Sequence, residues 1–226
     1  MTISPGLLSA IQTTLTATLS PNLTAGSKGD DLYEAYIWSV VLEAARNKGA
    51  TVSFRNVLGQ PVTGTFNFRT SPGELWWRTN NYCHAEISFA GCPPLEAHVG
   101  IYVAGRSKVR HECDVAVLYK NEADVCRSKQ ALPRASKVVL SVEAKYYAGS
   151  TLGLGLGRAF LGLCNEIQRN NRFFIANSPS KSIAKLLSKH TNIGFDLDFT
   201  PSTPHNVDVM RGLFEKVFAG FIAQET

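Results

Sequence analysis

The sequence predicts an α/β fold in which a mixed β-sheet is flanked by helices. A strand-like stretch at residues 137–147 begins with β-branched apolar residues, and β-prone runs fill residues 51–119. Segments with helical periodicity lie before and after these regions, at residues 30–48 and 206–223. The chain of 226 residues is long enough for a sizeable core and contains no internal repeat or low-complexity tract. We therefore expect a single domain spanning residues 1–226.

The N-terminal part is predicted to be helical. Residues 3–20 have apolar side chains at helical spacing, although their many Ser and Thr residues favour helix formation only weakly. The segment 30–48 is the stronger helix, because Asp30 and Asp31 lie where a helix N-terminus favours negative charge. Glu34 projects from the apolar stripe of this helix. Such a carboxylate is either half of a structural ion pair with Lys or Arg, or part of a functional site.

A strand-rich region follows, with turns rich in Gly, Pro and Asn between its segments. Its β-prone runs are residues 52–57, 65–70, 74–78, 84–89 and 96–103. We interpret His84 and His98 as ordinary strand residues. Trp76 and Trp77 predict packing against the sheet, and an aromatic platform for nucleic-acid bases is the alternative.

The two central strands carry the most informative polar residues. Asp114 begins the apolar run of residues 112–119, and Glu143 and Lys145 lie near the end of the strand at 137–147. Side chains alternate between the faces of a strand, so Glu143 and Lys145 point the same way. Charged groups at the end of a buried strand are costly unless they are paired or have a function. A surface ion pair is the simpler interpretation, and a catalytic site is the alternative.

Basic residues elsewhere are candidates for contacts with phosphates. Arg127 lies in a polar stretch, residues 120–136, which we expect to be a solvated loop. A glycine-rich loop at 148–158 lacks both the GxGxxG spacing and the closing Lys-Ser or Lys-Thr of nucleotide-binding loops. We expect it to allow a close backbone approach, with Arg158 at the start of a helix that reaches about residue 169. Three lysines at a spacing of four form either a solvated helix face or a phosphate-facing stripe: Lys181, Lys185 and Lys189.

Net charge, cysteine content and the length of apolar runs limit the class of protein. The net charge of +5 is compatible with a polyanionic partner without requiring one. The five cysteines are scattered and without CxxC spacing, which argues against a zinc site or a disulfide framework and predicts a cytoplasmic protein. No apolar run is long enough to span a membrane, and no signal peptide is visible.

The order of these motifs resembles the PD-(D/E)xK phosphodiesterases, the superfamily of restriction-endonuclease-like nucleases. The resemblance covers about residues 28–190 and consists of Glu34 on a helix, Asp114 on one strand and Glu143-Ala144-Lys145 on the next. Cys113 replaces the proline of the family motif, and the strand-rich region at about 51–110 extends a minimal core.

The resemblance implies a restriction-endonuclease-like mixed sheet and a metal-dependent phosphodiester hydrolase. Asp114, Glu143 and the main-chain carbonyl of Ala144 would hold Mg²⁺, for which Mn²⁺ would substitute, and Glu34 would bind a second ion or a metal-bound water. Lys145 would orient or deprotonate the attacking water or stabilise the transition state. Hard cations such as Mg²⁺ take oxygen ligands, typically one or two carboxylates with waters and substrate phosphate, so these residue types suit the chemistry.

The sequence thus predicts an endonuclease that acts on DNA, with RNA not excluded, in restriction or antiphage defence. A homodimer or a higher homo-oligomer is expected, because cleavage of two strands needs two active sites. One alternative is a nucleic-acid-binding module of the same fold without catalysis. A second is a nuclease gated by a small ligand or a partner, with residues 51–110 serving recognition or gating.

Overall fold

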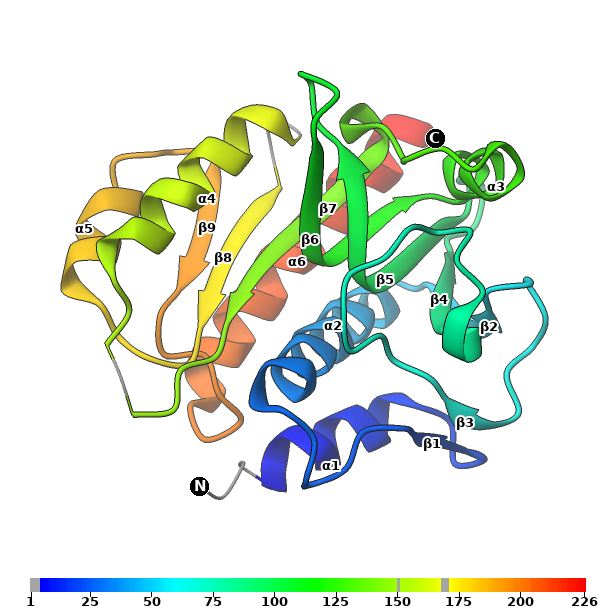
Figure 1. Cartoon of the computed structure of the whole chain (residues 1–226), viewed down its shortest axis with the longest axis horizontal. Coiled ribbons are helices and arrows are strands. Elements are labelled where there is room, and N and C mark those ends of the chain that lie inside the picture. Colours follow the sequence, from blue (N-terminus) through cyan, green and yellow to red (C-terminus); the bar gives the residue numbers. More distant parts are fainter. Residues whose placement is uncertain (1–4, 150, 168–170) are drawn as a thin grey trace.

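The computed structural model describes residues 5–149, 151–167 and 171–226 of the chain. A seven-stranded mixed sheet, in the order β2-β4-β5-β6-β7-β8-β9, forms its centre (Figure 1). The strands of this sheet are β2 (Thr51–Asn56), β4 (Cys83–Ser88), β5 (Leu95–Ala104), β6 (Arg110–Tyr119), β7 (Val138–Lys145), β8 (Arg172–Ala176) and β9 (Ile193–Asp196). The predicted α/β class with a mixed sheet is therefore confirmed.

Helices cover both faces of the sheet (Figure 1). The helices are α1 (Pro5–Thr14), α2 (Gly29–Asn47), α3 (Lys120–Lys129), α4 (Leu154–Glu166), α5 (Lys181–Leu187) and α6 (Pro204–Glu225), with 3₁₀ turns at Thr79–Asn81 and Ala135–Lys137. Alternate residues of β8 divide between the two layers: Phe173 packs in the core with α2 and α6, whereas Phe174 packs with α4 and α5. Within the described ranges, no helix combines the length and the apolar character needed to cross a membrane.

The largest core fixes α2 firmly against the sheet. Most of this helix is buried, and the indole Nε1 of Trp38 donates a hydrogen bond of 3.1 Å to the carbonyl of Ala97 on β5. Aromatic rings of Phe54, Phe66 and Phe68 surround the Trp38 side chain. Packing of this kind outweighs helix propensity, and it gives the side chains near the N-terminus of α2 a fixed position.

Two central strands separate part-way along their length. The ladder between β6 and β7 is antiparallel and ends at the pair Val115–Val142. Beyond that pair, β6 continues along β5 to Arg110, whereas β7 continues in parallel along β8 to Lys145. We call this opening between β6 and β7 the strand fork. It lies where the sheet changes from antiparallel to parallel pairing.

Several predicted elements differ from the structure. The helix predicted at 3–20 ends at Thr14, and Leu19–Pro21 forms strand β1, which pairs in parallel with β3 (Gly64–Phe66). Residues 74–78 are not a strand, and Trp77 is 42% exposed rather than packed against the sheet. The helix predicted to reach about residue 169 ends at Glu166, and residues 168–170 lie outside the described part of the chain.

The prediction of a solvated loop at 120–136 was also wrong, because the first part of this segment is helix α3. The polar composition indicates a loop, although Lys, Glu, Ala and Arg all have high helix propensity. Glu122, Ala123 and Cys126 are buried, and Ala123 and Cys126 pack with residues of β5 and β6. The helix therefore lies on the sheet and is not a connection through solvent.

Candidate active site

Asp114 lies at the strand fork and is 4% exposed. Its Oδ2 accepts a hydrogen bond of 2.7 Å from the backbone N–H of Ala144 on β7. The carboxylate thus takes the place of a ladder hydrogen bond between the two strands. In an extended strand, the N–H and C=O of one residue point to the same side. The carbonyl of Ala144 therefore also faces the fork.

Lys145 joins the two carboxylates of the predicted motif. Its Nζ lies 3.2 Å from Oδ2 of Asp114 and 2.7 Å from Oε1 of Glu143. The predicted convergence of these three side chains is therefore present in the structure. Their catalytic and metal-binding roles stay predictions.

The charge state of Lys145 follows from these neighbours. Burial disfavours the charged amine, but the carboxylates of Asp114 and Glu143 outweigh burial and raise the pKa of Lys145. The side chain is therefore an ammonium group at neutral pH. An ammonium donates hydrogen bonds and stabilises negative charge, whereas it does not accept a proton from water.

Glu34 reaches the same site from the first turns of α2. Burial, followed by the charges of Asp114 and Glu112, raises its pKa to about 9, with Lys145 acting in the opposite direction. Among the described residues, no Lys or Arg forms an ion pair with Glu34. The structural ion pair considered from the sequence is therefore not formed, and Glu34 faces other carboxylates.

Glu112 is a member of this group that the sequence analysis missed. Burial raises its pKa, and the neighbouring Asp114 adds to the effect. It precedes Asp114 by two residues on β6, and that spacing was the available signal. The pKa of Glu143 is raised in the same way, by burial and then by Asp114, and is partly offset by Lys145.

The group has an excess of acidic side chains that suits a hard cation. The carboxyl groups of Glu34, Glu112, Asp114 and Glu143 influence one another and the ammonium group of Lys145. Mg²⁺ needs only one or two protein carboxylates, with waters and phosphate completing its octahedron. The part of the chain that the structure describes brings no three of these acids together with all ligand atoms within 4.8 Å. The donor set therefore fits a cation that keeps several waters.

The predicted phosphate-binding residues have different surroundings. Arg158 on α4, and Lys181 and Lys185 on α5, are exposed, and Lys189 lies beyond the end of α5. Arg127 is different, because its guanidinium binds the carboxylates of Glu96 and Asp124. A role for Arg127 with nucleic acid stays a prediction, and its charge is already largely compensated.

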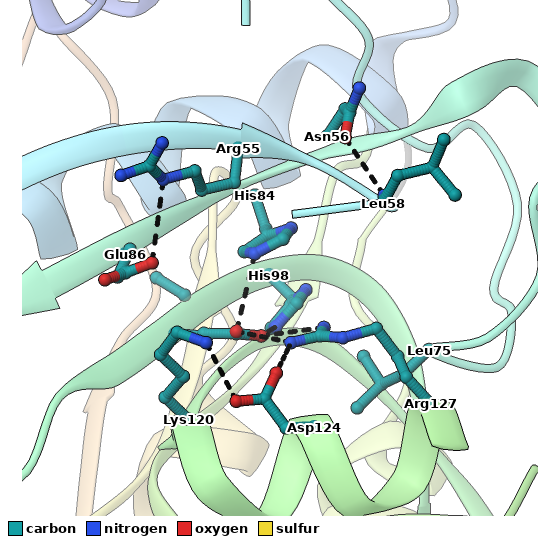
Figure 2. A network of polar contacts seen from close by, with 12 residues as sticks. Arg55, Asn56, Leu58, Leu75, His84, Glu86, His98, Lys120, Asp124 and Arg127 are labelled. Carbon is teal, nitrogen blue, oxygen red and sulfur yellow. Dashed lines mark hydrogen bonds and ion pairs between the residues drawn. The ribbon is translucent and has the colours of Figure 1, made fainter. Parts of the chain in front are cut away.

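A second cluster of titratable groups lies on β4 and β5, which the sequence analysis treated as ordinary. His84, Glu96 and His98 are almost fully buried, and Glu96 contacts both histidines and Arg127. Figure 2 shows the side chains of His84, His98 and Arg127 close together. The Nε2 atoms of His84 and His98 lie 3.5 Å and 3.0 Å from the two oxygens of Glu96. Arg127 binds both oxygens as well, at 2.5 Å and 3.0 Å. The alternating Glu96 and His98 on one strand were the available sequence signal.

The His84–Glu96–His98 cluster could hold a metal ion, since its ligand atoms lie within 4.8 Å of one another. However, a carboxylate has about four lone-pair positions, and two imidazoles with two guanidinium nitrogens occupy all of them. Burial lowers the pKa of His98 to about 3, so its ring is neutral. Among the residues that the structure describes, the Nδ1 atoms of both histidines have no hydrogen-bond partner, whereas metal-binding histidines usually donate from this second nitrogen. The geometry favours a closed hydrogen-bond network.

Comparisons with known proteins assign no family to the chain. It matches no protein-family model, no curated protein and no solved structure. The functional argument therefore depends on the geometry of the strand fork and of the cluster around Glu96.

Proposed function

We propose that the protein is a metal-dependent endonuclease of the PD-(D/E)xK superfamily that hydrolyses phosphodiester bonds in DNA. The observation that supports this most strongly is the meeting of Asp114 and Glu143 at Lys145 in the strand fork. Phosphodiester hydrolysis needs acids that hold a cation and a group that stabilises negative charge. Asp114, Glu143 and Lys145 supply these on two diverging strands, and Glu34 adds an acid from α2.

In this proposal, Asp114, Glu143 and the Ala144 carbonyl would hold Mg²⁺ or Mn²⁺, and Glu34 would bind a second ion or a metal-bound water. The bound cation would neutralise charge on the phosphoryl group and lower the pKa of a water molecule. Lys145, whose Nζ lies beside Asp114 and Glu143, would either donate hydrogen bonds to the developing charge in the transition state or serve the attacking water.

Contacts with the nucleic acid would come from exposed basic residues beyond the fork. Arg158, Lys181 and Lys185 have solvent-accessible side chains that can approach a phosphate backbone. Their contacts would be independent of base sequence, and RNA remains a possible substrate. A cytoplasmic homodimer or higher homo-oligomer in restriction or antiphage defence is the biological setting that we propose.

The test is cleavage of supercoiled plasmid DNA by pure protein with Mg²⁺, with Mn²⁺ or with EDTA. Nicking should require the metal and should be lost in Asp114→Asn, which keeps the shape of the side chain. Asp208→Asn is the matched control, because Asp208 is an exposed acid on α6. Cleavage that persists in Asp114→Asn would reject the proposed site. DNA binding without cleavage under every metal condition would instead favour the binding-module alternative.

A further inference from the structure

A pocket of about 360 Å³ lies beside the cluster around Glu96, away from the residues of the strand fork. Most of its lining comes from the strand-rich region at residues 51–110, and the rest from α3. The volume is in the range of small-molecule sites. The strands that extend the sheet beyond β5 therefore build a concave site of their own.

The floor of this pocket is held in place by the buried network. Glu96 is fully buried, and the two histidines and Arg127 satisfy it completely. A buried ion pair usually stabilises a fold no more than apolar packing would, because both charges lose their hydration. What the network provides is one fixed position for the Arg127 guanidinium, whose side chain is 17% exposed.

The walls of the pocket carry basic side chains whose ion pairs with acidic residues are weak enough for a bound anion to replace them. Arg55 lies 3.7 Å from Glu86, and Lys120 lies 2.8 Å from Asp124 in a partly exposed pair (Figure 2). Such pairs contribute about 0–1 kcal/mol, so an anion can compete for the cations at small cost. Arg78 at the rim is exposed and forms no ion pair with any described residue.

Apolar and aromatic groups complete the lining. Trp76 is half-buried and makes no ring contact with another aromatic residue in the described ranges. Leu58 is 53% exposed on a turn that the side chain of Asn56 fixes, since its Oδ1 accepts from the N–H groups of Leu58 and Gln60. A flat ring could stack on Trp76 and cover Leu58, and such stacking is favourable for any base.

We propose that this pocket binds a nucleotide, with its base against Trp76 and Leu58 and its phosphate groups facing Arg55, Arg78 and Lys120. The site is separate from the strand fork and does not depend on nuclease activity. It gives the region at residues 51–110 a function in ligand binding.

The experiment is isothermal titration calorimetry on the full chain in EDTA, with the four nucleoside 5′-triphosphates, the matching nucleosides and inorganic phosphate. At least one triphosphate should bind at least tenfold more tightly than its nucleoside and than phosphate. Loss of one charge-assisted contact weakens binding by about tenfold or more, so Arg78→Ala and Arg55→Ala should each do so. Trp76→Leu should have a similar effect. Lys216→Ala, an exposed site on α6, should bind like the wild type.

Three results would overturn the proposal. The first is the absence of binding by every triphosphate at millimolar concentration. The second is equal binding of phosphate and nucleotide. The third is nucleotide binding that Lys145→Met abolishes and Arg78→Ala leaves intact, which would place the ligand in the strand fork. None of these results depends on cleavage of DNA, so the proposed nuclease function stands or falls separately.

Discussion

Replacement of Glu34 by Gln removes one titratable carboxyl group from the strand fork while keeping the shape of the side chain. Burial and the neighbouring carboxylates raise the pKa of Glu34 from 4.5 to about 9. A carboxyl group with a raised pKa destabilises the folded state as the pH rises above 4.5, and the cost grows until the pH reaches the raised value. Between pH 4.5 and pH 7 the cost approaches about 3 kcal/mol at most, at 1.36 kcal/mol per pH unit.

Glu34→Gln should therefore be more stable than wild type at pH 7 in EDTA. We expect a gain of about 1–3 kcal/mol, because the carboxylates share protons, and this corresponds to an increase of about 2–10 °C in Tm. The gain should be small at pH 5 and should increase towards pH 8. Glu43→Gln is the matched control, because Glu43 lies on the same helix and is half-exposed, so its Tm should change little.

Thermal melts with Mn²⁺ complete this test. Saturation at about 100 times the dissociation constant should stabilise the wild type by about 2.7 kcal/mol. Glu34→Gln should gain less from Mn²⁺ and should cleave DNA much more slowly. A lower Tm of the variant in EDTA at pH 7, with an unchanged response to Mn²⁺, would refute the reasoning and make Glu34 a structural residue.

Three further predictions concern other side chains. Lys145→Met should slow metal-dependent cleavage by at least about 100-fold while DNA binding persists, as gel shifts beside the cleavage assay would show; unchanged cleavage would exclude Lys145 from the chemistry. Replacing Lys181 and Lys185 by Gln should reduce the salt dependence of DNA affinity by about one log–log unit per lost phosphate contact, and an unchanged slope would assign both to solvent. Arg127→Ala should lower the free energy of unfolding by about 3–5 kcal/mol in urea melts, because Glu96 would remain buried and uncompensated; a loss below about 1 kcal/mol would contradict this.

The meeting of Asp114, Glu143 and Lys145 was predictable because these residues lie on two successive strands and follow strand periodicity. Alternation along β7 places Glu143 and Lys145 together, and the apolar run after Asp114 predicts β6. The cluster around Glu96 was not predictable in the same way. It depends on the register between β4 and β5, which brings His84 near Glu96. It also depends on helix α3, which stands where a loop was expected and places Arg127 against Glu96. Tertiary pairings of this kind leave little signal in the local pattern.

The hydrogen bond from Ala144 to Asp114 has a consequence for how this chain can change over time. Asp114 lies in the proposed site and also accepts the hydrogen bond of the Ala144 N–H at the edge of β7. Replacement of Asp114 by an apolar residue would leave this buried N–H without its acceptor, at a cost of about 1–3 kcal/mol. A lineage that lost nuclease activity would therefore still be under selection for a hydrogen-bond acceptor at position 114. Selection would then favour Asn over Ala at position 114. An Asn there would indicate a descendant that kept the fold and lost metal binding.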